Sequence, residues 1–108
     1  MVVIRIHSDL QMENNISRLR QLQRNDAVVI KNCIIVNFLG ISNKIGELTI
    51  NNCTISSLEG IESFSNLSML NLSNNNLRDI QLISELKQIQ ILNLQDIIGQ
   101  YPLRLCAT

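Results

Sequence analysis

The side chains in this chain that could serve thiol catalysis, redox exchange or zinc binding include one histidine and three cysteines, His7, Cys33, Cys53 and Cys106. Structural zinc takes four protein ligands, and none of these cysteines stands in a CxxC pair. A nucleophilic thiol needs an imidazole beside it that an Asn or Asp orients, and His7 lies far from every cysteine in the sequence. We therefore expect no metal site, no disulfide framework and no catalytic residues, and we do not expect an enzyme.

Charge and glycine spacing both argue against phosphate-bearing ligands. Nine Lys and Arg balance nine Asp and Glu, so no net field attracts a polyanion. The glycines match neither G-x-x-x-x-G-K-S/T nor G-x-G-x-x-G. A basic run at Arg18, Arg20 and Arg24 is offset by Glu13 and Asp26, which is typical of a solvated helix face. We expect no nucleic acid, no cofactor and no small-molecule substrate.

The apolar residues follow a repeat. Residues 67–77 read L-x-x-L-x-L-x-x-N-x-L without a mismatch, and residues 45–55 match the same pattern 22 positions earlier, with Cys53 in the place of Asn75. The agreement continues beyond the motif at the same offset, where Leu58, Ile61 and Phe64 align with Ile80, Ile83 and Leu86. Partial copies flank these two, one over 25–44 that fails its first position at Asn25 and one over 89–96 whose register is lost by Gly99.

This motif resembles the leucine-rich repeat, in the 22-residue class found in a protein phosphatase regulatory subunit, bacterial internalins and a spliceosomal ribonucleoprotein. The resemblance implies an α/β fold, a leucine-rich repeat solenoid with short parallel strands on the concave side and 3₁₀ or short helical turns on the convex side. The alternation of Leu70 and Leu72 predicts a short strand with both side chains pointing inward. Apolar residues at every third position after the motif fit a 3₁₀ turn.

The pattern divides the chain into three parts. Residues 1–24 do not repeat, and we expect Val2 to Ile6 to form an edge strand and residues 9–24 a helix that caps the first repeat. That helix would carry Met12, Ile16, Leu19 and Leu22 along one side. Residues 25–96 hold the repeats 25–44, 45–66, 67–88 and the partial 89–96. Residues 97–108 contain no recognisable cap, so we expect an irregular, uncapped tail.

Three polar or thiol side chains occupy one position of the repeat, where the strand ends. Asn75 offers two N–H donors and one acceptor to backbone groups that the turn leaves unpaired. Cys33 and Cys53 fill the equivalent positions with a small apolar thiol that is also a weak donor. We interpret Cys33, Cys53 and Asn75 as a structural ladder, with a redox or metal-binding pair as the less favoured alternative.

The residues between the inward positions must point outward onto the concave face. They fall into three columns that are mostly polar, small and nearly neutral, with Met69 and Ile91 as the apolar spot. Such a surface suits a broad contact with another protein, although an ordinary solvated sheet is the alternative. The residues expected to bind a partner are Lys31, Glu47, Thr49, Asn51, Met69, Asn71, Ser73, Ile91, Asn93 and Gln95.

The function that follows is non-catalytic binding of a partner protein through the concave face, and the resemblance implies a regulatory or scaffold subunit. The alternative is a fragment of a longer leucine-rich repeat protein that self-associates or assembles through its uncapped C-terminal end. No segment is long and apolar enough for a signal peptide or a membrane span. We therefore expect a cytoplasmic protein, with the nucleus as the alternative compartment and no membrane contact.

Overall fold

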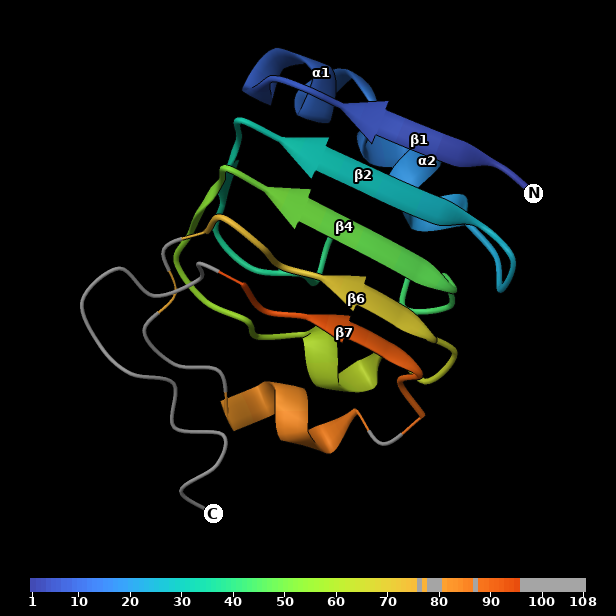
Figure 1. The fold of residues 1–108 in the computed structure, drawn as a ribbon. Helices are drawn as coiled ribbons and strands as arrows, with labels where there is room; N and C mark the ends of the chain where they lie inside the picture. The colour runs from blue at the N-terminus through green and yellow to red at the C-terminus, as the bar shows by residue number, and fades with distance from the viewer. Residues whose placement is uncertain (76, 78–80, 87, 96–108) are drawn as a thin grey trace.

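The structure of the chain is a computed structural model that describes residues 1–75, 77, 81–86 and 88–95. It is a mixed α/β fold around one five-stranded parallel sheet in the order β1-β2-β4-β6-β7 (Figure 1). The strands of this sheet are β1 (Val3–Ile6), β2 (Ala27–Lys31), β4 (Glu47–Asn51), β6 (Met69–Asn71) and β7 (Ile91–Asn93).

Neighbouring strands pair at the offsets of the sequence pattern. Strand β4 pairs with β6, and β6 with β7, at an offset of 22 residues, so that Leu48, Leu70 and Leu92 are aligned. Strand β2 pairs with β4 at an offset of 20 residues, which aligns Val28 with Leu48. Strand β1 extends the sheet at its first edge, with Ile4 beside Val28. Equivalent positions therefore form columns across the sheet.

One face of the sheet is packed into the core. The side chains at the two inward positions of the repeat are 0 % exposed in the first three repeat strands. They lie in β2, in β4, and in or directly after β6: Val28, Ile30, Leu48, Ile50, Leu70 and Leu72. Phe38 and Phe64, from the segments that follow β3 and β5, are buried in the same core. In β7 the layer is incomplete, because Leu92 in the same column is 43 % exposed.

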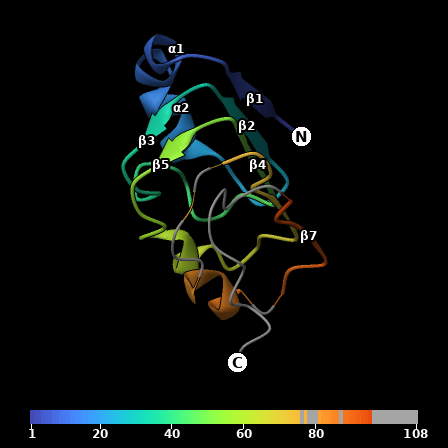
Figure 2. The ribbon, with the colours of Figure 1, turned by 60° about the vertical axis from the view of Figure 1, so that its left-hand side comes forward.

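The segments behind the sheet are short, as expected from apolar residues at every third position. Strands β3 (Ile34–Ile35) and β5 (Thr54–Ile55) pair in a small parallel sheet of their own, seen from the side in Figure 2. Two 3₁₀ turns follow, η1 (Ile61–Ser63) and η2 (Gln81–Glu85). Gly60 begins η1 with φ 99°, a conformation that glycine adopts without strain.

The N-terminal segment differs from its prediction. Instead of one helix over residues 9–24, there are two, α1 (Asp9–Asn14) and α2 (Ile16–Gln21). Asn15 interrupts them with φ −115° and ψ 12°, and its side-chain Nδ2 donates to the carbonyl oxygen of Gln11 at 2.7 Å. An Asn side chain that bonds nearby backbone competes with the helical ladder. The side chain of Ile16, directly after this break, is 42 % exposed, so Ile16 does not lie on the buried side predicted for the helix.

Ser8 begins α1 as an N-cap, since its hydroxyl accepts the backbone N–H of Gln11 at 3.2 Å. No helix among the described residues is long and apolar enough to cross a membrane. The predicted tail at 97–108, including Cys106, and the point near Gly99 where the last copy loses register lie outside the described residues.

Candidate functional site

The carboxyl ends of β2, β4 and β6 are linked by the ladder of Cys33, Cys53 and Asn75. Asn75 Oδ1 accepts the backbone N–H of Cys53 at 2.8 Å, while its Nδ2 donates to the carbonyl oxygens of Ile50 and Leu72, each at 2.7 Å. Cys53 Sγ in turn accepts the backbone N–H of Cys33 at 3.4 Å. All three side chains are buried, and every buried side-chain nitrogen or oxygen in the described part of the chain has a hydrogen-bond partner.

Both thiols of the ladder are protonated at neutral pH. Burial, followed by the effects of nearby Cys53 and Asp9, raises the pKa of Cys33 to about 11. Burial likewise raises the pKa of Cys53. A neutral thiol is neither the nucleophile nor the metal-binding form. Within the described residues no group of three or more His, Cys, Asp or Glu side chains could hold a metal ion.

Asparagine makes the turns that follow these strands. Asn32, Asn52 and Asn74 have φ of 58°, 53° and 61°, the left-handed region that Asn tolerates better than most residues other than glycine. The turns are also bonded to one another, because Asn52 Nδ2 donates to Asn32 Oδ1 at 2.7 Å and the Asn52 backbone N–H donates to the carbonyl oxygen of Asn74 at 3.0 Å. This placement explains how a chain with few glycines reverses after each strand.

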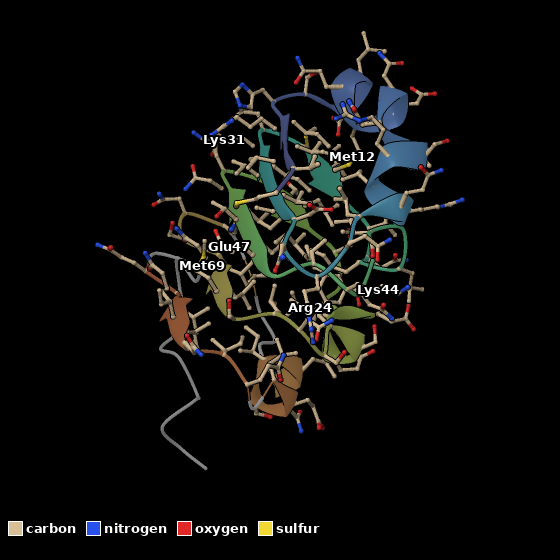
Figure 3. All side chains as sticks on the ribbon, turned by 90° about the vertical axis from the view of Figure 1, so that its right-hand side faces the viewer. Met12, Arg24, Lys31, Lys44, Glu47 and Met69 are labelled. Atoms are coloured by element: carbon tan, nitrogen blue, oxygen red, sulfur yellow. The ribbon has the colours of Figure 1, made fainter. Side chains whose placement is uncertain are left out.

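The face of the sheet turned away from the core, here called the open face, carries the residues expected to bind a partner. Figure 3 shows Lys31, Glu47 and Met69 projecting together on this side, with Met12 and Lys44 on the other side of the molecule. The strand register aligns these residues as expected from the sequence. One column holds Glu47, Met69 and Ile91, the next holds Thr49, Asn71 and Asn93, and Lys31 pairs with Asn51 in the third.

The open face is partly exposed. Lys31, Ile91 and Gln95 are exposed, and the exposed fraction of Ile91 is 62 %. The other residues expected to bind a partner are half-buried, with the exception of Ser73. Ser73 is 9 % exposed, and its carbonyl oxygen accepts Asn51 Nδ2 at 3.1 Å. The expected contact role of Ser73 is therefore replaced by a structural one, because the residue lies in the turn after β6 and its polar groups are used within the fold.

Two residues of the open face escaped the sequence analysis because β1 lies outside the repeat. Arg5 pairs with Val29, so it heads the column that continues to Thr49. His7 directly follows β1 and is exposed, as Arg5 is. The signal was present in the alternation of buried Ile4 and Ile6 with exposed Arg5 and His7, which identifies the outward side of an edge strand.

The basic run in α2 and the segment that follows it does not form one site. Arg18, Arg20 and Arg24 are exposed, and of these only Arg20 reaches a cavity of about 300 Å³ away from the open face. Lys44 lies on the same cavity wall, together with Phe38 and Leu39.

The open face can make hydrogen bonds, charge contacts and apolar contacts with a ligand. Its one imidazole belongs to His7. Asp9, two residues later in the sequence, already has a hydrogen-bond partner, because its Oδ1 accepts the backbone N–H of Ile34 at 2.8 Å.

In comparisons with known proteins, no family model, curated protein or solved structure matches this chain.

Proposed function

We propose that this chain is a leucine-rich repeat solenoid that binds a partner protein through the open face of its sheet, as a non-catalytic regulatory or scaffold subunit. The open face would be the concave face of such a solenoid. The strand register supports the proposal, because equivalent positions recur every 20 to 22 residues from β2 to β7. Repeat proteins commonly use extended surfaces of this kind to bind their targets.

The observation that carries this proposal is the difference between the two faces of the sheet. The side chains of the inward columns are buried from β2 to β6, whereas most of the small polar side chains of the outward columns are at least partly exposed to solvent. Met69 and Ile91 are paired in one outward column and would supply an apolar centre. A surface with few charges and an apolar spot suits a protein ligand better than a polyanion.

The test compares two threonine-to-arginine variants of the same chain. Thr49→Arg places a long cation in the middle of the open face, and Thr54→Arg places it at an exposed position of β5 behind the sheet. Proteins captured on the unaltered chain are identified, purified and titrated against all three forms by calorimetry. A partner that binds the unaltered and Thr54→Arg chains with equal affinity, but binds Thr49→Arg with an affinity changed at least tenfold in either direction, supports the proposal. Equal binding by all three forms would place the contact elsewhere.

A second function is favoured by the exposure of the last described strand. Ile91 and Leu92 in β7 are 62 % and 43 % exposed, although Leu92 lies in the inward column. An aliphatic layer left open at one end of a stack promotes association with another chain. The alternative is thus assembly through the β7 end, either with a second copy or within a longer leucine-rich repeat protein.

Light scattering at several concentrations distinguishes these functions. Assembly through β7 predicts oligomers that grow with concentration and are lost in Leu92→Asp, while Leu10→Asp, at an exposed leucine of α1, leaves them intact. A monomer at every concentration would leave the open face as the surviving proposal.

A further inference from the structure

We propose that the partner of the open face contributes an extended acidic segment, whose carboxylates lie against Arg5 and Lys31 at the β1–β2 end of the face. This inference rests on the proposed binding function and adds the chemistry of the partner. Arg5 pairs with Val29, two residues before Lys31, so the two cations stand on adjacent strands as diagonal neighbours. Both are exposed, and within the described part of the chain neither side chain takes part in a hydrogen bond or an ion pair.

The amides of the open face add hydrogen-bond donors to these cations. Asn71 Oδ1 accepts the backbone N–H of Ser73, and Asn93 Oδ1 accepts the backbone N–H of Gln95, both at 3.0 Å. Because a backbone N–H needs an acceptor, these bonds determine which side-chain atom is the oxygen. The Nδ2 groups of Asn71 and Asn93 make no hydrogen bond to the described residues and are left to donate to a ligand. The middle column therefore favours a ligand rich in acceptor oxygens.

The one carboxylate in the columns determines the direction of the ligand. Glu47 lies at the amino end of β4, in the column of Met69 and Ile91, and Lys31 lies at the carboxyl end of the neighbouring β2 (Figure 3). A like charge near Glu47 is unfavourable, while a carboxylate near Lys31 is attracted. The acidic residues of the segment should therefore lie over β1 and β2, and an apolar residue should lie over Met69 and Ile91.

Strand spacing sets the length of the segment. Parallel strands lie about 4.8 Å apart, so the column from Arg5 to Asn93 spans about 19 Å across five strands. An extended chain rises about 3.3 Å per residue, which corresponds to about six residues. Lys31 and the apolar pair on β6 and β7 are two to three strands apart and four residues apart along the strands, which is about 16 to 20 Å, so acidic and apolar residues should be about five to six positions apart.

Selection of short random peptides displayed on phage, with the intact folded chain as bait, tests this inference. The expected outcome is enrichment of peptides that carry Asp or Glu about five to six residues from an aliphatic residue. Synthetic copies should bind about tenfold more weakly to Arg5→Gln/Lys31→Gln, since exposed ion pairs are individually weak. The matched control is Arg20→Gln/Lys44→Gln, which removes the same charge at the cavity on the other side and should leave affinity unchanged. Thermal melting checks that each variant remains folded.

The outcomes separate this inference from the function on which it rests. Peptides that lack acidic residues yet lose binding in Thr49→Arg would overturn the acidic partner and leave the open-face function standing. If acidic peptides bind but lose affinity for Arg20→Gln/Lys44→Gln instead, the binding site is the cavity that Arg20 and Lys44 line. A single-stranded oligonucleotide that binds through Arg5 and Lys31 more tightly than the peptides would replace the protein ligand by nucleic acid. If no selected peptide responds to Thr49→Arg or to Arg5→Gln/Lys31→Gln, both proposals are overturned.

Discussion

Asn75 is buried at the carboxyl end of the sheet, where its amide bonds one backbone N–H and several carbonyl groups at once. A thiol cannot do the same, because it has a single weak donor. Cys53 and Cys33 nevertheless fill the same position of the pattern nearer the first edge, where Sγ lies 3.3 Å from the carbonyl oxygen of Asn51 and 3.1 Å from that of Lys31, respectively. The two residue types therefore differ in how much of the turn they stabilise.

Replacement of Asn75 by leucine should lower the free energy of unfolding by about 1 to 3 kcal/mol, because the N–H of Cys53 and the carbonyl of Ile50 would be left unpaired in the core. Cys53→Asn should be tolerated, since an amide can make the hydrogen bonds of this position. Urea denaturation of both variants measures the difference. Equal losses would contradict the ladder.

The carboxylate of Asp26 should make stability depend on pH at the acidic end. Backbone N–H groups of Gln23 and Val2 donate to its two oxygens, each at 2.8 Å, and these bonds lower the pKa of Asp26 below the ordinary value of 3.8. A lowered folded-state pKa stabilises the protein above the unfolded value, and this contribution is lost as the pH falls through the folded value.

Asp26→Asn should therefore reduce the melting temperature at neutral pH. The gap in melting temperature between this variant and the unaltered chain should narrow below a pH of 3.8. Thermal melts from neutral pH to about pH 2 measure this gap. A gap that stays constant over the range would show that the charge of Asp26 contributes nothing.

At the scale of elements, the short turn that begins η1 depends on the absence of a side chain. Gly60 has φ 99°, and a Cβ built on it would lie 2.9 Å from Leu39 Cδ2 and 3.0 Å from the backbone of Phe38. Gly40 provides a matched control, because a Cβ there would meet nothing within 4 Å.

Gly60→Ala should destabilise the fold by about 1 to 3 kcal/mol, through backbone strain and the close approach of the 38–39 segment. Gly40→Ala should be nearly neutral or slightly stabilising, since it restricts the unfolded chain without a clash. Parallel denaturation curves of the two variants test this, and a larger loss in Gly40→Ala would contradict the geometry at η1.

For the whole molecule, burial along the sheet is uneven. Leu48 and Leu70 are fully buried in the same column that leaves Leu92 partly exposed, and β7 has a described neighbour on one side only. Local opening requires less free energy where fewer apolar contacts must be broken.

Hydrogen exchange followed by mass spectrometry should therefore find the slowest amides in β2 and β4 and markedly faster exchange in β7. Peptides from β1 should be intermediate, because Ile4 and Ile6 are buried although the strand lies at an edge. Protection of β7 equal to that of β4 would mean that the β7 edge is covered in solution, as assembly through this end predicts.

The spacing of apolar residues predicted the strand positions, their register and the 3₁₀ turns, and the family that the pattern resembles implied that the strands are parallel. This was achievable because each strand of the repeat carries its own alternation, and a constant offset between copies aligns equivalent residues. The use of Asn at the turns was also local, since it depends on the conformation of single residues such as Asn52.

Other features depend on contacts between residues far apart in the sequence, and only the tertiary structure decided them. The join of β1 to β2 brought Arg5 and His7 onto the open face. Likewise, the contact between Asn51 and Ser73 removed Ser73 from the accessible surface. Periodicity specifies which side of an element a residue faces, whereas its partners follow from how the elements pack.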